Sequence, residues 1–546
     1  MDSAVQPQPE ETTLTRLARS RWIVLLPFAY ILGQFLLVYL GSEGLFERDG
    51  YYHARFANLL PSFGLSRDFH WTQFSTWNGQ FCDKEFLFHV LMVPFTLDSN
   101  EPVTGAKVFG ALLGCGVFLA LFLVLRAHGA RLPVLFTLLP LCMGATFLMR
   151  VLMIRSHVLS MLLLLIGMHF LLKQNWKALA ALGFVYAWSY TFPLLLVMTA
   201  VPFAIGRSLI ERKLDWKSPL AALGGVLAGL IIHPYSPHTL ETFVTYLQVV
   251  AQGTAGVTAK MELGHEIYAL SLGEMLQRLP LYCALTIALI GIALAARRKL
   301  SGAAMGALFA ALFWSAMTRL YARFIEYSAP LTALAAGLVF RDLLGNVELR
   351  QIFETYRTRA AAAVVATIVV LAATHAITMT HVHEQMIAGA SGPPYYRKAR
   401  KWMDENLRPG DTVAHLWWED FRDLYYDCYR QNFIWGLDPT YTLRYDATVA
   451  RNLELMRTRQ ALINPHWIAS GLKARVLVML QPNAVQHPEL TSSDWRPVYA
   501  DETAVIFALE GPHAPPEELV ARRRSAPLTP FPPTWLPLEG RRGDAR

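Results

Sequence analysis

The sequence predicts a polytopic α-helical membrane protein with about eleven transmembrane helices and a C-terminal, outward-facing α/β domain. Of its 546 residues, 54% are hydrophobic and 16% are charged, and the mean hydropathy is +0.31. Soluble domains have about 25% charged residues, so this composition is typical of a membrane protein. The net charge of +8 comes without a dense basic tract or an RNA-binding motif, so nucleic acid is not an expected partner.

The apolar runs define the predicted helices. Nine runs are each long enough to cross about 30 Å of hydrocarbon. The stretch 178–206 is too long for one straight helix and contains Pro193, so it predicts two short spans and a total of eleven. The nine runs are 22–40, 105–125, 132–149, 157–172, 219–233, 279–296, 301–317, 326–340 and 360–378.

The basic residues between the runs predict the orientation. With eleven spans all the basic clusters fall on one side, and the positive-inside rule makes that side cytoplasmic. The N-terminus is then cytoplasmic and the C-terminal domain is periplasmic or extracellular, as expected of a multi-pass protein of a bacterial inner membrane. The clusters are 16–21, 126–131, 173–177, 207–217, 297–299 and 341–359.

The predicted domains follow from these spans. A transmembrane domain covers 22–380 and carries long outer loops at 41–104 and 233–278. The C-terminal part mixes helical stretches (395–407 and 448–462) with strand-like ones (412–416, 474–480 and 504–509). The complete set is a cytoplasmic N-terminus (1–21), the transmembrane domain, a periplasmic α/β domain (381–510) and a disordered tail rich in Pro and Arg (511–546).

Two cysteines fall in segments that are predicted to lie outside. Cys82 and Cys428 either form a disulfide there or remain two free thiols.

The segment that follows the first span carries the main candidate site. Its sequence from Asp49 to Arg55 is Asp-Gly-Tyr-Tyr-His-Ala-Arg. In a helix, Tyr52 and His53 would share a face with Asp49. Asp49 either binds a metal or orients and deprotonates an acceptor, or it is simply the N-cap of a short helix.

This segment is similar to the Asp-x-x-Tyr-x-x-Arg signature in the first outer loop of oligosaccharyltransferase catalytic subunits, a family with the GT-C glycosyltransferase fold. The spans, the two long outer loops and the C-terminal α/β domain resemble that family as well. The resemblance implies that Asp49 is catalytic and contacts the metal and the acceptor, with Tyr52, His53 and Arg55 on the substrate.

A second patch lies between the third and fourth spans. The family places paired acids here, whereas this chain has Arg155 and His157 and no acid. Both side chains suit a phosphate, because guanidinium binds it through a bidentate fork and imidazole carries charge near neutral pH. The alternative is a snorkelling arginine beside a histidine that is satisfied by its neighbours.

The second long loop contains Glu262 and Glu266. The resemblance implies a loop glutamate that reaches the acceptor and the metal, and Glu266 is the candidate, with Glu262 as the other choice. A glutamate in a solvated loop is the alternative.

Arginines lead into the tenth predicted span, where charge is costly unless it is paired. The family holds its lipid-linked substrate with an Arg-Phe pair at this point, which matches Arg323. Arg319 and Arg323 together would suit a phosphate or pyrophosphate. Pairing of Arg323 with Glu326 for packing alone is the alternative.

Trp417 and Trp418 open the soluble domain and are followed by Glu419-Asp420-Phe421. They resemble the start of the Trp-Trp-Asp-Tyr-Gly motif that recognises an acceptor sequon, but the Tyr-Gly part is replaced. The two tryptophans therefore either contact substrate, as sugar-stacking aromatics, or only pack.

The resemblance implies a glycosyltransferase that moves a sugar or oligosaccharide from a polyprenyl-phosphate or pyrophosphate donor to a glycan, protein or lipid acceptor on the outer face. Displacement at the anomeric carbon needs one carboxylate, because phosphate already leaves well. Transfer with a divalent cation (Mg or Mn) at Asp49 and transfer without a metal both remain open. A transporter or flippase of lipid-linked glycans, or a degenerate scaffold, is the alternative function.

Overall fold

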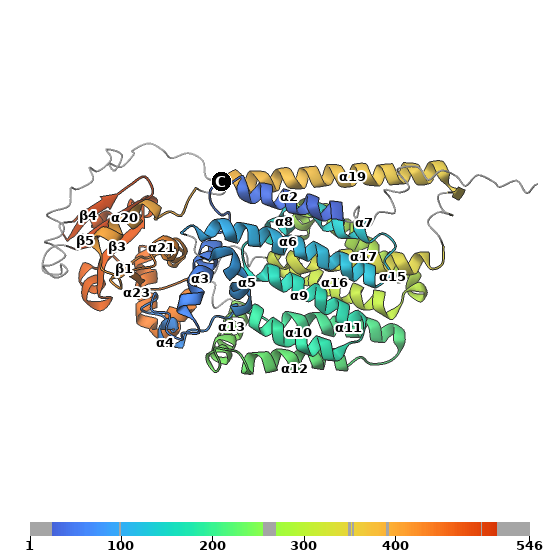
Figure 1. Ribbon diagram of the computed structural model, residues 1–546, viewed down its shortest axis with the longest axis horizontal. Coiled ribbons are helices and arrows are strands. Elements are labelled where there is room, and N and C mark those ends of the chain that lie inside the picture. Colours follow the sequence, from blue (N-terminus) through green and yellow to red (C-terminus); the bar gives the residue numbers. More distant parts are fainter. Residues whose placement is uncertain are drawn as a thin grey trace, which may run out of the picture.

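The computed structural model describes residues 25–97, 100–254, 269–347, 351, 354–388, 392–492 and 494–509. A bundle of helices forms one end of the molecule and a small α/β domain forms the other, with α3 between them (Figure 1). The bundle helices are α2 (Leu26–Leu40), α6 (Pro102–Ala127), α7 (Pro133–Leu138), α8 (Ala145–Val151), α9 (Ser156–Leu172), α10 (Trp176–Ser189), α11 (Leu195–Glu211), α12 (Lys217–Ile231), α15 (Pro280–Ala296), α16 (Gly302–Leu320), α17 (Ile325–Leu344) and α19 (Arg357–His383).

The helices of the bundle differ in length. Among the described residues, four helices are long and apolar enough to cross a membrane, or five if one bent pair counts as a single span, and four more are apolar but shorter. Long apolar helices of this kind make the chain a multi-pass membrane protein. The predicted count of eleven spans is not confirmed. The long helices are Pro102–Ala127, Pro280–Lys299, Gly302–Leu320 and Arg357–Ile387.

Two breaks within the bundle test the predicted spans. The break at Pro193 is confirmed, because α10 ends at Ser189 and α11 begins at Leu195. The apolar run predicted as a span at 132–149 is not one straight helix, since the chain bends by 102° between the helical segments Pro133–Cys142 and Ala145–Val151. Gly144 lies at this bend with φ +118°, a conformation that only glycine adopts easily.

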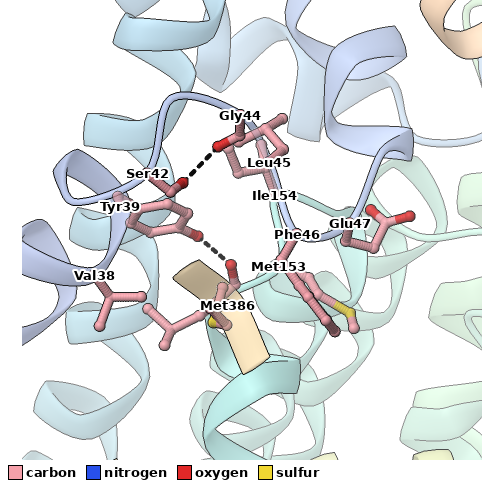
Figure 2. A pocket seen from close by; sticks show the side chains of 11 residues that line it. Val38, Tyr39, Ser42, Gly44, Leu45, Phe46, Glu47, Met153, Ile154 and Met386 are labelled. Carbon is pink, nitrogen blue, oxygen red and sulfur yellow. Dashed lines mark hydrogen bonds between the residues drawn. The ribbon is translucent and has the colours of Figure 1, made fainter. Parts of the chain in front are cut away.

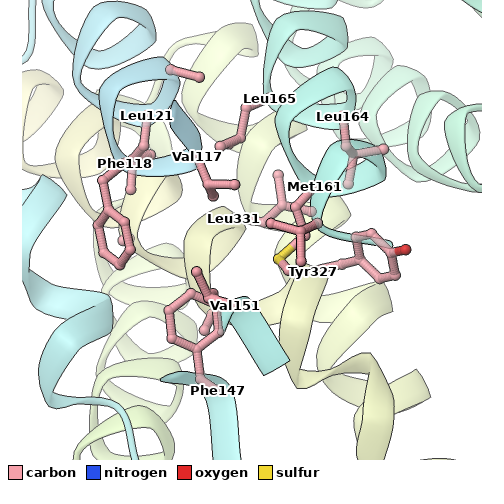
Figure 3. Packing of buried hydrophobic residues seen from close by; sticks show 14 of the residues in the cluster. Val117, Phe118, Leu121, Phe147, Val151, Met161, Leu164, Leu165, Tyr327 and Leu331 are labelled. Carbon is pink, nitrogen blue, oxygen red and sulfur yellow. The ribbon is translucent and has the colours of Figure 1, made fainter. Parts of the chain in front are cut away.

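The bundle is held together by one large apolar core. Figure 3 shows side chains of α6, α8, α9 and α17 that meet in its centre. The free energy gained by burying apolar side chains does not depend on which neighbour buries them. The choice of helix pairs therefore depends on how closely their side chains pack. The labelled residues are Val117, Phe118, Leu121, Phe147, Val151, Met161, Leu164, Leu165, Tyr327 and Leu331.

One ion pair lies inside this bundle. Arg150 of α8 donates from Nε to Oε2 of Glu326 of α17 at 2.8 Å, and its Nη2 lies 2.7 Å from the same oxygen. Both side chains are buried, at 5% and 0% exposed. Removal of one partner leaves the other charge buried without its counter-ion.

We expect Glu326→Ala to destabilise the protein by about 3–5 kcal/mol for this reason. The measurement is thermal denaturation of the full chain in detergent. The double substitution Arg150→Met with Glu326→Met should recover most of the loss, because no charge is then stranded. Glu405→Ala, which removes the exposed pair of Lys401 and Glu405, is the control and should leave the transition unchanged. Equal effects of Glu326→Ala and Glu405→Ala would contradict the role of the buried pair.

The segments of the transmembrane part that are predicted to lie outside, here called the first and second outer loops, are also helical. The first outer loop contains α3 (Asp49–Phe63), α4 (Trp77–Gln80) and α5 (Phe86–Thr96), and the second contains α13 (His238–Thr254) and α14 (Leu272–Arg278). Helix α5 is apolar, and its buried residues include Phe88 and Met92 of the bundle core.

The C-terminal domain is a five-stranded mixed sheet with helices. Its strand order is β2-β1-β3-β5-β4, with β1 parallel to β2 and β3, and β5 antiparallel to β3 and β4. The elements are β1 (Thr412–Ala414), β2 (Asn432–Phe433), β3 (Ala474–Leu480), β4 (Trp495–Ala500), β5 (Ala504–Leu509), α20 (Arg397–Asn406), α21 (Phe421–Asp427), α22 (Pro439–Tyr445), α23 (Ala447–Arg457) and α24 (Gln481–Ala484).

The predicted elements of this domain are confirmed for two helices and three strands. Strands β3 and β5 have the predicted bounds, while β1 and α23 end earlier than predicted. Two strands were not predicted. β2 has only two residues, and β4 contains Pro497, which a strand tolerates because β4 lies at the edge of the sheet.

The first outer loop is built into the C-terminal domain. Backbone bonds run from Phe433 N to Trp71 O (2.7 Å) and from Gln73 N to Phe433 O (2.8 Å), so residues 71–73 lie along β2. One buried cluster combines aromatic residues of the loop with residues of α21 and the sheet. Cys82 and Cys428 both lie in this cluster as free thiols, which decides between the two predicted alternatives.

Candidate functional site

The site begins where α3 begins. Asp49 is the first residue of α3, and the preceding Arg48 makes no side-chain cap. The Asp49 carboxylate instead accepts from Arg422 Nη1 at 3.0 Å and lies 3.0 Å from Nη2 of Arg155. The N-cap alternative is therefore wrong, and both carboxylate oxygens of Asp49 lie within 3.0 Å of a guanidinium nitrogen.

The two arginines come from distant parts of the chain. Arg155 stands immediately before α9, on extended backbone, in the loop where the sequence predicts a phosphate ligand. Arg422 lies in the first turn of α21, and its Nε donates to the carbonyl of Glu419 at 2.9 Å. Because Arg422 is separated from Asp49 by more than 370 residues, no local signal in the sequence could have identified the pair.

A second carboxylate lies beside Asp49. Glu47 accepts through Oε1 from the backbone N–H of Asp49 at 3.0 Å and lies 3.9 Å from Nη1 of Arg155. Its other oxygen, Oε2, is buried and makes no hydrogen bond to any residue that the structure describes. Glu47 is not among the predicted site residues, because a single glutamate at the start of a loop carries no pattern.

The carboxylates of Asp49 and Glu47 have different pKa values because their surroundings differ. Burial raises the pKa of Asp49, but the charges of Arg155 and Arg422 outweigh burial and hold it well below its ordinary value. Burial also raises the pKa of Glu47, and the charge of Asp49 raises it further, to about 7. At neutral pH Asp49 is therefore ionised and Glu47 titrates, as expected of an acid–base pair with divided roles.

Glu47 also lines a pocket at the junction of α2, the first outer loop and the segment before Arg155 (Figure 2). Apolar side chains make most of the wall, and the hydroxyl of Tyr39 donates to the Leu152 carbonyl at 2.5 Å. The pocket thus combines an apolar wall with one carboxylate. Its lining residues are Val38, Tyr39, Ser42, Gly44, Leu45, Phe46, Glu47, Leu152, Met153, Ile154 and Met386.

Tyr52 and Arg55, predicted on the substrate, are buried between α3 and the C-terminal domain. Tyr52 stacks on Phe56 with ring centroids 5.8 Å apart. Arg55 donates to the carbonyl of Tyr426 at 2.7 Å and to Asn58 at 2.9 Å. These contacts fasten α3 to its neighbours, and contact of either residue with substrate stays a prediction.

His157 lies close to Arg155 in sequence but is deeply buried, at 2% exposed. Its Nε2 lies 2.8 Å from the carbonyl oxygen of Arg150. This contact agrees with the alternative to phosphate binding, in which neighbouring groups satisfy the histidine. The charges of Arg155 and Arg323 both act on its ring, so these two arginines lie in the same neighbourhood. A role of His157 on phosphate stays a prediction.

Arg319 lies in the last turn of α16, and Arg323 lies in the connection between α16 and α17. Arg323 is part of a 3-10 turn (Ala322–Phe324) directly before α17, and its charge also acts on Tyr190. The carbonyl of Arg319 accepts from the backbone N–H of Leu270 at 3.0 Å, so this residue lies where the described part of the second outer loop resumes. Glu262 and Glu266 lie outside the described residues.

Trp417 and Trp418 are half-buried against the core of the sheet domain. The Trp417 ring contacts that of His487 with centroids 6.0 Å apart, edge to face. Trp418 begins a 3-10 turn (Trp418–Asp420) that leads directly into α21 and therefore into Arg422. Sugar stacking by these rings stays a prediction. The turn Trp418–Asp420 positions Arg422, because the carbonyl of Glu419 accepts from Nε of Arg422.

Comparison with known proteins was made by sequence and by structure. No protein-family model and no curated protein matches the sequence. An oligosaccharyltransferase of Archaeoglobus fulgidus in the apo form matches the structure with a TM-score of 0.57 at 13% identity, covering 91% of this chain and 75% of that one. ArnT of Cupriavidus metallidurans bound to undecaprenyl phosphate matches with a TM-score of 0.53 at 15% identity, covering 91% and 100%. Both are GT-C glycosyltransferases.

The chain has the GT-C fold. The predicted resemblance to oligosaccharyltransferases is confirmed at this level. A third structural match is AglB of Archaeoglobus fulgidus in complex with an inhibitory peptide and a dolichol-phosphate, with a TM-score of 0.53 at 13% identity, covering 84% of this chain and 70% of that one.

The resemblance also implies a divalent cation at Asp49, and the surroundings of this residue do not fit one. Mg²⁺ needs near-octahedral oxygen ligation. Here both Asp49 oxygens face guanidinium groups, whose positive charges oppose a cation, and the neighbouring loop supplies Arg155 in place of an acid.

Proposed function

We propose that this GT-C protein is a membrane glycosyltransferase that moves a sugar or oligosaccharide from a polyprenyl-phosphate or pyrophosphate donor to an acceptor on the outer face of the membrane. The observation that carries the proposal is the clamp of Asp49 between Arg155 and Arg422, next to Glu47 and its apolar pocket. The dolichol-phosphate in the AglB complex and the undecaprenyl phosphate bound to ArnT support a donor of this class.

The charges at the site suit a phosphate. Two guanidinium groups face one ionised carboxylate, Asp49, and a second carboxylate, Glu47, whose pKa is about 7. Positive charge is therefore in excess when Glu47 is protonated and nearly balanced when it is ionised. Planar guanidinium groups bind phosphate oxygens bidentately, so Arg155 and Arg422 stabilise the charge that develops on the departing phosphate.

The reaction is a displacement at the anomeric carbon. The acceptor oxygen or nitrogen attacks this carbon, and the bond from the sugar to the phosphate oxygen breaks with its electron pair on the phosphate. Glu47 takes the proton of the acceptor, since its pKa of about 7 matches neutral conditions. Asp49 is too weak a base for this step and instead holds both arginines in place.

Arg155 provides the direct test of donor binding. In full-length protein in nanodiscs, we expect Arg155→Ala to weaken binding of undecaprenyl phosphate about 10- to 100-fold, because one charge-assisted contact is worth about 1.5–3 kcal/mol. Binding is measured by native mass spectrometry. Arg155→Lys should recover only part of the affinity, since an ammonium lacks the planar fork.

The matched control is Arg298→Ala, in the basic turn Arg297–Lys299 after α15, which should bind the lipid as wild type does. Equal affinity of Arg155→Ala and wild type would refute the phosphate role of Arg155.

A further inference from the structure

A second cluster of polar side chains lies one helical turn along α3 from Asp49. His53 of α3, His89 of α5 and Glu85, the residue before α5, offer ligand atoms that all lie within 4.8 Å of one another. The Nδ1 atom of His53 lies 2.9 Å from Nε2 of His89 and 3.8 Å from Oε2 of Glu85. Both histidines are buried, at 5% and 1% exposed.

Two of these side chains, His89 and Glu85, also form hydrogen bonds to residues outside the cluster, through the atoms that point away from it. His89 donates from Nδ1 to the carboxylate of Asp83 at 2.9 Å, so its Nε2 lone pair faces His53. Oε1 of Glu85 accepts from the hydroxyls of Ser156 (2.7 Å) and Thr191 (3.1 Å), which leaves Oε2 toward the histidines. A carboxylate behind a histidine and hydroxyls behind a carboxylate are the second shell that protein metal sites use to orient their ligands.

The charge of the cluster favours a cation. Asp83, Glu85 and the neighbouring Asp49 are three acids, against which Lys84 and Arg155 bring two positive charges; Lys84 acts on Glu85, and both Asp49 and Arg155 act on His53. Asp83 is itself buried, at 3% exposed, so its charge is poorly screened. The histidines add neutral nitrogen lone pairs to this net negative environment.

We propose that His53, Glu85 and His89 bind a divalent transition metal ion, with zinc the best fit, and that Asp83 orients His89 for this purpose. Two imidazoles and one carboxylate form a ligand set that zinc uses when a fourth position is left open. Bonds of about 2.0–2.1 Å in a tetrahedron place ligand atoms about 3.3 Å apart. The separations of 2.9 and 3.8 Å lie on either side of that value, and all three ligand atoms lie within 4.8 Å of one another, so the side chains must draw together to close the site.

The metal positions the catalytic groups. It ties α3, which carries Asp49, to α5, and through Glu85 and Ser156 to the start of α9, which follows Arg155. This site is separate from Asp49, whose carboxylate faces Arg155 and Arg422. Metal binding does not depend on the proposed transferase function, but its effect on transfer does.

The test uses tag-free full-length protein in detergent, stripped with a chelator, reloaded with zinc chloride and dialysed. We expect elemental analysis to find about one zinc ion per chain in the wild type. His89→Ala and Glu85→Gln should lose it, and Asp83→Asn should keep a site that is about 10- to 100-fold weaker. Zinc should also raise the melting temperature of the wild type but not that of His89→Ala.

The matched control is His169→Ala. His128 and His169 also form a close pair, with ring nitrogens 3.2 Å apart, but they belong to no three-ligand group among the described residues. This variant should keep its zinc. Wild-type protein that is monodisperse and retains no zinc after loading overturns the inference. Because elemental analysis needs no substrate, that result is independent of whether the protein transfers sugar.

Discussion

Asp49→Asn is expected to lower the rate of glycosyl transfer by about 10²- to 10³-fold, the usual cost of weakening the groups that stabilise charge on the departing phosphate. Asparagine has nearly the same shape but no charge, so it cannot balance Arg155 and Arg422. The arginines are then free to move, and the charge pattern that receives the phosphate is lost. The measurement is transfer of labelled sugar from a polyprenyl-phosphate donor by the full chain in proteoliposomes.

Asp68→Asn is the matched control, since Asp68 is an exposed residue of the same outer loop. It should transfer at the wild-type rate. Full activity of Asp49→Asn and Asp49→Ala would remove the role assigned to Asp49. If these variants and the wild type move lipid-linked glycans across the bilayer without any transfer, the protein is a flippase rather than a transferase.

Glu47→Gln is expected to remove the acidic limb of the pH profile of kcat/KM, which is the fall in kcat/KM as the pH drops below 7. In the wild type Glu47 must be ionised to take the acceptor proton, and its pKa is raised to about 7. The value of kcat/KM should therefore fall about tenfold per pH unit below pH 7 and level off above it. A glutamine cannot accept the proton, so the variant should be about 10²- to 10⁴-fold slower near pH 7, with a rate that no longer follows this limb.

Glu43→Gln is the control for this experiment, because Glu43 is exposed in the same turn as Glu47. It should keep both the rate and the limb. A Glu47→Gln variant with the wild-type profile would show that another group takes the proton. That outcome would leave the result for Asp49 intact, because Asp49 acts through its charge on the two arginines.

Part of the site could be read from the sequence because it is local. The Asp49 segment predicts a helix with Tyr52 and His53 on the face of Asp49, and α3 does begin at Asp49. The loop with Arg155 was selected because the resembled family places paired acids there and because guanidinium suits a phosphate. Its partner is a carboxylate of another loop, which the sequence could not show.

The bend at Gly144 shows a limit of hydropathy. An apolar run reports that residues avoid water, but it does not report whether they form one straight helix. Pro193 gave a local sign of a break, because proline removes a backbone donor. Gly144 breaks the predicted span at 132–149 through its positive φ, and a glycine inside an apolar run is too common to predict this.

The sequence by itself determined the membrane class, most helices of the bundle, strands β3 and β5, and the helix that follows the first span at Asp49, because these depend on composition, periodicity and a short motif. The tertiary structure alone decided that Arg422 faces Asp49, that Glu47 is buried beside Asp49, which raises the pKa of Glu47 to about 7, and that His53, Glu85 and His89 meet. Each of these depends on contacts between segments that are distant in the chain or on burial of a charge. Neither a contact between distant segments nor the burial of a charge leaves a periodic signal in one sequence.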